Sequence, residues 1–214
     1  MVLALFIELP GSGGDDGGAC PVGGSRHHLA LGPAVCTHFE SAASPRTSRS
    51  QALWRVDETY VRVAGNWTYL YRAVDSAGDT IDFMLSPKRD LTAAKLFLRL
   101  ALSGTGGVRP RVVNVDGHAA YARAIAELKQ SGELSRHCRC RPSPYLNNII
   151  EQDHRFIKKR ITASLGFRSA DGAWRTIEGY EAMHVIRKGQ IRWLAKGDVI
   201  GQRQFIHTLF GIAA

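Results

Sequence analysis

The 214-residue sequence has few cysteines and no long apolar run, and each absence narrows the classes of protein it can belong to. No stretch of 18 or more apolar residues occurs, so we expect no transmembrane helix and no membrane partner. The apolar residues 1–7 lack the basic residues that precede the apolar core of a signal peptide, which favours a cytoplasmic location. The cysteines are too few and too unevenly spaced for a disulfide scaffold, which favours a reducing compartment: Cys20, Cys36, Cys138 and Cys140.

Acidic residues are also in deficit, because 19 Asp and Glu stand against 28 Lys and Arg, for a net charge of +9. Residues 1–50 hold three arginines and four acids, so the positive excess lies entirely in residues 51–214. A folded segment this basic is a candidate to bind a polyanion, most often nucleic acid. A basic surface that serves only solubility is the alternative that charge leaves open.

Glycine and proline divide the chain into parts. Residues 1–50 contain eight of the 22 glycines and four of the eight prolines, with no sustained hydrophobic period. This composition predicts an irregular N-terminal arm over residues 1–50. No Gly-Lys-Ser/Thr follows its glycines, so they do not form a phosphate loop. We place a core at residues 51–165 and a helical C-terminal extension of that core at residues 166–214.

The pattern changes at Leu53, where β-branched and aromatic residues predict three strands at 53–63, 67–74 and 80–85. Turn signals at Gly65-Asn66 and Gly78-Asp79 make these strands an antiparallel meander. Helices and strands then alternate, with strands predicted at 111–115 and 136–140 and helices at 91–102, 119–129, 148–163 and 174–187. This order predicts an α/β fold, a mixed five-stranded sheet flanked by helices, as in the ribonuclease H-like fold.

Three acids occupy selected positions in this arrangement. Asp57 lies within the first strand, Asp116 ends the fourth, and Glu151 stands near the start of helix 148–163. The first and fourth strands are neighbours at the sheet centre of this fold, so the three carboxylates are expected to meet. Carboxylate oxygens suit Mg²⁺ or Mn²⁺, and two such ions about 3.5–4 Å apart can serve phosphoryl displacement. Surface acids on a strand edge are the alternative, since 19 acids yield many triplets by chance.

Two further acids in strand-like stretches are assigned other roles. Asp75 precedes Ser76-Ala77-Gly78 and is assigned to the turn. Asp82 alternates with Ile81 and Phe83, so it is predicted to face solvent.

Helix 148–163 presents cations beside its acid. Arg155 and Lys158 follow Glu151 by four and seven residues and so share its face, with Lys159 and Arg160 close by. These four cations are candidates to contact DNA phosphates. An ion pair between Glu151 and Arg155 on a solvated face is the alternative.

Three other patterns carry less information. His137, Cys138 and Cys140 lack a second ligand pair at zinc-site spacing, so we do not assign zinc there. His154, one turn after Glu151, fits either the metal site or a packed helix position. A stripe of large residues at helical spacing is assigned to the core rather than to base stacking: Trp174, Tyr180, Met183 and Ile186.

Several separate segments, in order, resemble the catalytic core of bacterial insertion-sequence transposases of the DDE class, closest to insertion-sequence family six. The resemblance covers about residues 51–210. The segments are Trp54-Arg-Val-Asp-Glu-Thr-Tyr-Val61, Tyr69-Leu-Tyr-Arg-Ala-Val-Asp75, Tyr145-Leu-Asn-Asn-Ile-Ile-Glu-Gln-Asp-His154, Leu165-Gly-Phe-Arg-Ser169 and Glu181-Ala-Met-His-Val-Ile-Arg-Lys-Gly-Gln190.

The resemblance implies that Asp57, Asp116 and Glu151 are the catalytic, metal-binding triad, and that Lys158 matches the cation that follows the family's Glu. The implied cofactor is Mg²⁺ or Mn²⁺, as two ions. The implied partners are DNA, as transposon ends and target, and further copies of the chain on that DNA. The implied reactions are nicking at the element's ends and strand transfer in a bacterial, nucleoid-associated protein.

One departure from the family concerns the N-terminal region. Family members carry a helix-turn-helix there for recognising the ends, whereas residues 1–50 show no such pair of periodic helices. Two alternatives therefore stay open. One is a truncated, non-catalytic remnant that binds DNA or pairs with a transposase. The other is a structure-directed nuclease of the same fold.

Overall fold

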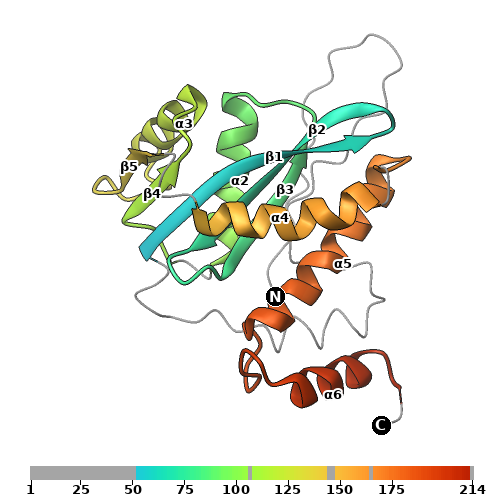
Figure 1. Cartoon of the computed structure of the whole chain (residues 1–214). Coiled ribbons are helices and arrows are strands. Elements are labelled where there is room, and N and C mark those ends of the chain that lie inside the picture. Colours follow the sequence, from blue (N-terminus) through green and yellow to red (C-terminus); the bar gives the residue numbers. More distant parts are fainter. Residues whose placement is uncertain (1–51, 106–107, 144–147, 164–165, 213–214) are drawn as a thin grey trace.

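A five-stranded mixed sheet forms the centre of the molecule (Figure 1). The computed structural model describes residues 52–105, 108–143, 148–163 and 166–212, so the predicted arm at residues 1–50 lies outside the described residues. The sheet order is β3-β2-β1-β4-β5, antiparallel from β3 to β1 and parallel from β1 to β5. This is the predicted ribonuclease H-like arrangement. The strands are β1 (Leu53–Val63), β2 (Asn66–Asp75), β3 (Thr80–Ser86), β4 (Val112–Val115) and β5 (Arg139–Pro142).

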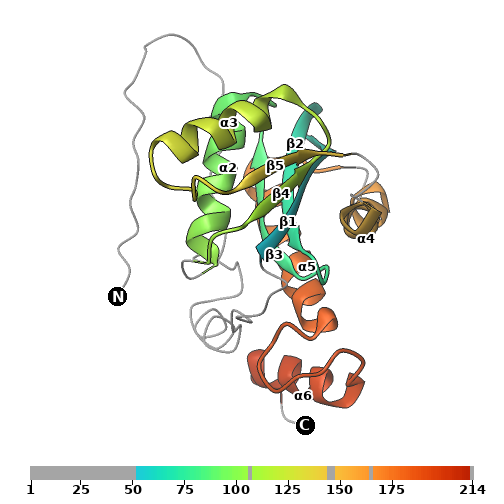
Figure 2. The ribbon, with the colours of Figure 1, turned by 90° about the vertical axis from the view of Figure 1, so that its left-hand side faces the viewer.

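Helices cover both faces of the sheet. One face carries α2 (Leu91–Gly104) and α3 (Ala119–Gln130), and the other carries α4 (Asn148–Ala163) and α5 (Ala170–Lys188), as Figure 2 shows. A last helix, α6 (Val199–Leu209), packs against the end of α5. None of these helices is long and apolar enough to cross a membrane. The predicted elements are confirmed with small shifts at their ends, of which the largest is the start of α5, four residues before its predicted position.

Local sequence sets the turns of the meander. Ala64 and Gly65 both have positive φ angles, 49° and 81°, as a two-residue hairpin loop of type I′ requires. At the next turn the carboxylate of Asp75 accepts hydrogen bonds from the backbone N–H groups of Ala77 and Asp79, at 2.8 and 2.9 Å. The prediction that Asp75 serves the turn is therefore confirmed.

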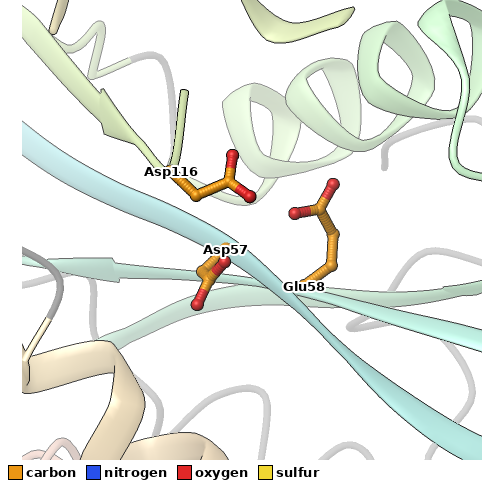
Figure 3. A group of neighbouring side chains, drawn as sticks. All are labelled: Asp57, Glu58 and Asp116. Atoms are coloured by element: carbon orange, nitrogen blue, oxygen red, sulfur yellow. The ribbon is translucent and has the colours of Figure 1, made fainter. Parts of the chain in front are cut away.

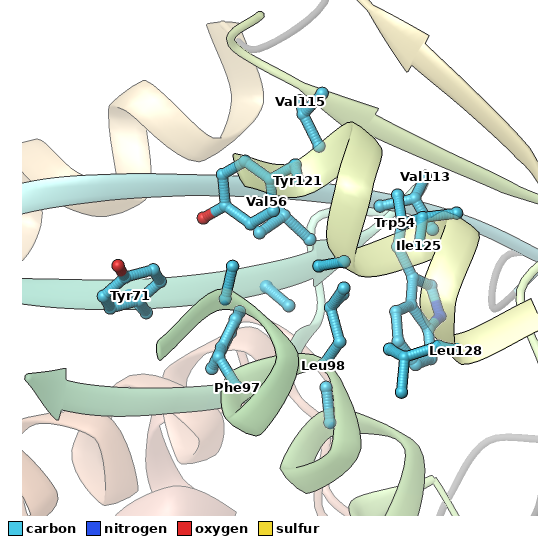
Figure 4. Close-up of a cluster of buried hydrophobic side chains, with 14 of the residues drawn as sticks. Trp54, Val56, Tyr71, Phe97, Leu98, Val113, Val115, Tyr121, Ile125 and Leu128 are labelled. Carbon is cyan, nitrogen blue, oxygen red and sulfur yellow. The ribbon is translucent and has the colours of Figure 1, made fainter. Parts of the chain in front are cut away.

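Successive side chains of β1 point to opposite faces of the sheet and so pack in two separate hydrophobic cores. Trp54 and Val56 point to the α2–α3 face and join a cluster of fully buried side chains there (Figure 4). Val61 and Val63 point to the opposite face, where isoleucines of α4 and α5 cover them. Helix α4 presents an apolar stripe of three isoleucines that are at most 6% exposed: Ile150, Ile157 and Ile161. Strand β1 therefore contributes side chains to the core on each face of the sheet.

Two predictions of exposure are wrong. Asp82 was expected in solvent but is 2% exposed, because both faces of β3 are covered and a register shift next to Ala73 breaks the simple alternation. Met183 was expected in the core but is 37% exposed. It belongs to a stripe in which Ile186 is buried while Trp174 and Tyr180 are half-buried, so that stripe meets the core only in part.

The segment after α4 is attached to the end of β1. The backbone N–H of Phe167 donates to the carbonyl of Arg62 at 2.8 Å, and the N–H of Ala64 donates to the carbonyl of Phe167 at 2.7 Å. Gly166 makes this approach possible, because its φ is 94° and a Cβ there would lie 2.9 Å from the Arg62 carbonyl oxygen. The strand that carries Asp57 and the helix that carries Glu151 are thus hydrogen-bonded through this segment.

Candidate metal and nucleic-acid site

The pairing of β1 with β4 brings two distant acids side by side. The two strands are parallel, and Leu53, Trp54 and Arg55 lie opposite Val112, Val113 and Asn114. Continued by two residues, the same register places Asp57 beside Asp116. Because β4 ends at Val115, its pairing with β1 ends before Asp57, and the next pairing of β1 on this side among the described residues is at Val63, with Phe167. The two carboxylates therefore stand where the sheet opens.

A third acid, which the sequence reasoning missed, completes a cluster. Asp57, Glu58 and Asp116 each offer a carboxylate oxygen, and these three oxygens lie within 4.8 Å of one another (Figure 3). Glu58 was overlooked because neighbouring residues of a strand point to opposite faces. Figure 3 shows Asp57 and Glu58 leaving β1 on opposite sides, as alternation requires, yet one carboxylate oxygen of each still lies within 4.8 Å of the other. The three are the only such ligand group among the residues that the structure describes.

Arg89 compensates part of this negative charge. Its guanidinium donates to both carboxylate oxygens of Glu58, at 3.2 and 3.3 Å, and also to the carboxylate of Asp116. The Glu58 side chain is only 3% exposed. The forked contact therefore supplies the pairing that a buried carboxylate requires. Glu58 is better paired than Asp57, which receives no contact from Arg89 among the described hydrogen bonds and ion pairs.

The electrostatics of Asp57 follow from that difference. Burial, with the nearby charges of Glu58 and Asp116, raises the pKa of Asp57 to about 7. His154 approaches it, with 3.5 Å between Nε2 and Oδ2. Burial, followed by the charges of Arg72 and Lys158, holds the pKa of His154 well below its usual range, so this imidazole is neutral and adds no compensating charge. The excess negative charge at Asp57 is left for a cation to balance.

The donor set fits a divalent metal ion. All three ligands are carboxylates, and hard oxygen ligands are the ones that Mg²⁺ and Mn²⁺ prefer. Three acids stand against one arginine, so the cluster carries an excess of negative charge when its acids are ionised. Sulfur and imidazole ligands, which suit zinc, are absent from this group.

Glu151 lies in an adjoining hollow rather than in the cluster of three. The hollow has a volume of about 430 Å³, and Asp57 and Glu151 both line it. Asp57 thus belongs to both the cluster and the hollow, whereas Asp116 belongs to the cluster and Glu151 to the hollow. The other lining residues are Glu58, Thr59, His154, Arg155, Lys158 and Lys159. Among the described residues, the structure thus brings Asp57 near Asp116 in the cluster and near Glu151 in the hollow, but it does not gather all three predicted acids in one group.

Three of the four predicted cations line this hollow with exposed side chains: Arg155, Lys158 and Lys159. Arg160 does not line it, since its guanidinium lies over the Phe156 ring, 3.7 Å from the centroid. Glu151 forms no ion pair within the described residues, so the alternative of a Glu151–Arg155 pair is not realised there. The hollow therefore combines an unpaired acid with unpaired cations.

Comparisons with known proteins show which family the sequence matches. A family profile described as a DDE domain matches residues 51–190. The chain is 38% identical over 141 residues to a transposase for the insertion sequence-like element IS431mec and to a transposase for the insertion sequence element IS257 in transposon Tn4003, both from Staphylococcus aureus. Each alignment covers 66% of this chain and 60% of the relative, so the chain spans about 60% of the length of these curated relatives.

A shorter relative and two solved structures complete the comparison. An uncharacterized protein of Yersinia pseudotuberculosis is 41% identical over 91 residues, which cover 42% of this chain and 85% of that protein. The catalytic core domain of HTLV-2 integrase, in complex with magnesium, is similar with a TM-score of 0.49 and 17% identity, over 72% of this chain and 100% of that one. An intasome of simian T-cell lymphotropic virus is similar with a TM-score of 0.47 and 16% identity, over 64% of this chain and 49% of that one.

Proposed function

Because the chain belongs to the DDE transposase family of the IS431 and IS257 insertion sequences, we propose that it carries out DNA nicking and strand transfer with Mg²⁺ or Mn²⁺. In the first reaction water attacks a phosphodiester and frees a 3′-hydroxyl at the element's end. In the second that hydroxyl attacks a phosphodiester of the target, so one phosphodiester breaks as another forms. No covalent bond to the protein is needed in either reaction.

One observation carries the proposal: an all-carboxylate cluster with excess negative charge adjoins a hollow that is lined by Glu151 and by three exposed cations. We assign Asp57 and Asp116 as metal ligands and Glu151 as the third acid of the catalytic triad. Glu58 extends the donor set and holds Arg89 in place. Two metal ions bound there would stabilise the attacking and the leaving oxygen of an in-line displacement.

The cations beside Glu151 have a separate task. Arg155, Lys158 and Lys159 are exposed around the hollow, where they can contact phosphate oxygens of DNA on both sides of the reacting group. Arg160, stacked on Phe156, supports the helix surface from which the others project. Such contacts position the DNA without reading its sequence. The DNA partners proposed are transposon ends and target, with further copies of this chain assembled on them.

The test uses a short duplex ending in a 3′-hydroxyl, a supercoiled target plasmid and Mg²⁺. Asp116→Asn should abolish nicking and joining while DNA binding is kept, because removing the charge removes a metal ligand with little change of shape. Asp171→Asn is the matched control, since Asp171 is an exposed acid paired with Arg175 on α5. Undiminished nicking by Asp116→Asn would refute the assignment.

The same assay separates the alternatives. A nuclease of the same fold would nick the plasmid and leave the supplied 3′-hydroxyl unjoined. A non-catalytic remnant would retain DNA with no turnover that depends on Mg²⁺. Joined product that requires Asp57, Asp116 and Glu151 together is the result expected of the transposase.

A further inference from the structure

A second, larger hollow lies at the opposite end of the central strands from the acids. Its volume is about 1060 Å³, and it is lined by the start of β1, the segment before β4 and the segment that leads into β5. No Asp or Glu contributes to its lining. The basic side chains of its lining are Arg109, Arg111, Lys129, Arg136, His137 and Arg139. We call this hollow the basic groove.

Backbone pairing fixes the position of two of these cations. The N–H of Arg111 donates to the Ala52 carbonyl at 2.7 Å, and the N–H of Arg139 donates to the Arg111 carbonyl at 2.8 Å. Three neighbouring segments thus stand side by side, and both arginine side chains are exposed on them. The sheet, rather than a flexible loop, sets the spacing of this pair.

The cations of the basic groove have no acidic partners within the described residues. Arg109 donates to the Gly132 carbonyl at 3.2 Å, and Arg136 contacts the neighbouring His137. Arg111, Lys129 and Arg139 form no ion pair there. By contrast, Lys95 and Arg99 of the same α2–α3 side are each paired with a glutamate. Unpaired like charges around one hollow repel each other, and an anion bound among them would relieve that repulsion.

We infer that the basic groove binds the phosphodiester backbone of DNA at a second place, apart from the catalytic acids. This inference rests on the proposed function, which makes DNA the polyanion that the chain meets. Leu53 and Val112 line the groove, whereas Asp57 and Asp116 lie four residues further along the same parallel strands. At ~3.3 Å per residue the separation is roughly 13 Å. DNA held in the groove is therefore out of reach of the acids and is positioned rather than cut.

The chemistry of the groove suits a nucleic-acid backbone more than a single small anion. Four of its cations are arginines, whose planar forks pair with phosphate oxygens. The arginines lie on two neighbouring chain segments and Lys129 lies on a third, so several phosphates can be contacted at once around this wide hollow. Each phosphate neutralised releases counterions, which makes the affinity fall with salt.

The test compares the full chain with Arg111→Ala/Arg139→Ala in EDTA, so that binding is measured without cleavage. The slope of log affinity against log salt should become shallower by about two, since each phosphate contact contributes about one. The matched control is Arg123→Ala/Arg187→Ala, which removes two exposed arginines outside the groove. Circular dichroism checks that each variant is folded.

Duplex length distinguishes two sources of the bound backbone. If a flank of the reacting duplex fills the groove, the loss of affinity appears with long duplexes and is absent with very short ones. If a separate duplex fills it, two short duplexes bind per protomer, and the variant binds one. Both results support the inference. A salt slope and affinity equal to those of the control variant would overturn it.

The outcome is distinguishable from failure of the proposed function. Nicking with an unchanged salt slope in the groove variant would leave the function standing and refute the groove. DNA binding that depends on the groove, without Mg²⁺-dependent nicking, would do the reverse. Absence of any DNA binding by the unaltered chain would refute both.

Discussion

Two clusters of acids and cations in the described part of the chain differ in the balance of their charges. Between the sheet and α4–α5, two cations meet two acids: Arg72 contacts Asp153 and Glu181, at 3.3 and 2.8 Å, and Lys188 contacts Asp153 at 2.6 Å. At the open edge of the sheet, three acids meet Arg89 alone. The first cluster is closed and balanced, whereas the second is partly open and carries excess negative charge.

The comparison teaches how one protein uses buried charge in two ways. The Arg72 side chain is fully buried, so its ion pairs persist only because both partners are present. The cluster at Asp57 keeps an imbalance that costs stability and that a metal ion would remove. Balance marks a cluster that holds helices on the sheet, and imbalance marks one prepared to bind.

The largest effect is expected from breaking the balanced cluster. Arg72→Met leaves Asp153 and Glu181 buried without their cation, and the loss should be about 3–5 kcal/mol in the free energy of unfolding. Urea denaturation followed by circular dichroism measures it. Adding Glu181→Met should recover part of the loss, because one unpaired charge is then removed. A loss under about 1 kcal/mol would show that water reaches these groups.

Removing an acid from the unbalanced cluster should act in the opposite direction. Asp57→Asn should stabilise the metal-free protein by on the order of 1 kcal/mol near neutral pH, since it deletes an uncompensated charge. Because the pKa of Asp57 is higher in the folded protein than in the unfolded chain, protonation of Asp57 stabilises the fold at low pH. This stabilisation is lost as the pH rises through the folded-state pKa of about 7. The gain over the unaltered chain should therefore grow between about pH 4 and about pH 7 in EDTA. A gain independent of pH would contradict this reasoning.

Mg²⁺ should raise the thermal stability of the protein by binding at the unbalanced cluster and not at the balanced one. With a Kd on the order of 1 mM, about 10 mM Mg²⁺ adds roughly 1.4 kcal/mol, which raises Tm by about 3–6 °C. The unaltered chain should show this shift in a thermal melt, and Asp57→Asn should show much less. Arg72→Met should keep the shift if it remains folded. Equal shifts in all variants would mean that the ion acts elsewhere.

The smallest effect is expected at a surface pair that belongs to neither cluster. Arg99 donates two hydrogen bonds to Glu133, at 2.7 and 2.8 Å, and these, with that of Ser131, lower the pKa of Glu133 to about 2. Solvent screens this exposed pair, so Arg99→Met should cost less than about 1 kcal/mol. A lowered carboxyl pKa gives stability above about pH 4.5 that is lost toward about pH 2. The two proteins should therefore converge in acid denaturation curves.

Much of the fold could be predicted because its signals are local. Alternation along β1, the N-cap at Asp90 and the isoleucine stripe of α4 each specify an element from a few neighbouring residues. The neighbouring positions of Asp57 and Asp116 followed from strand order and the parallel register. The prediction for Asp82 was wrong because alternation alone does not reveal that both faces of β3 are covered.

The sequence reasoning could not find side chains whose role depends on distant partners. Arg72 reads as an ordinary strand residue, and its partners lie 81 and 109 residues away. Arg89 precedes a helix cap and reads as a loop cation, yet it joins Glu58 to Asp116. The distance between Glu151 and the cluster also depends on how α4 lies across the sheet, which no local pattern determines.

That placement of α4 has a mechanical consequence. The helix is fastened near one end where Phe167 bonds to the backbone of β1, and near the other where Asp153 joins Arg72 and Lys188. These contacts near both ends of α4 fix its position on the sheet. Glu151 lies two residues before Asp153, so the buried ion pairs of Asp153 with Arg72 and Lys188 determine the position of this exposed acid. A substitution in this buried ion-pair cluster would therefore displace Glu151 although the residues that line the hollow are unchanged.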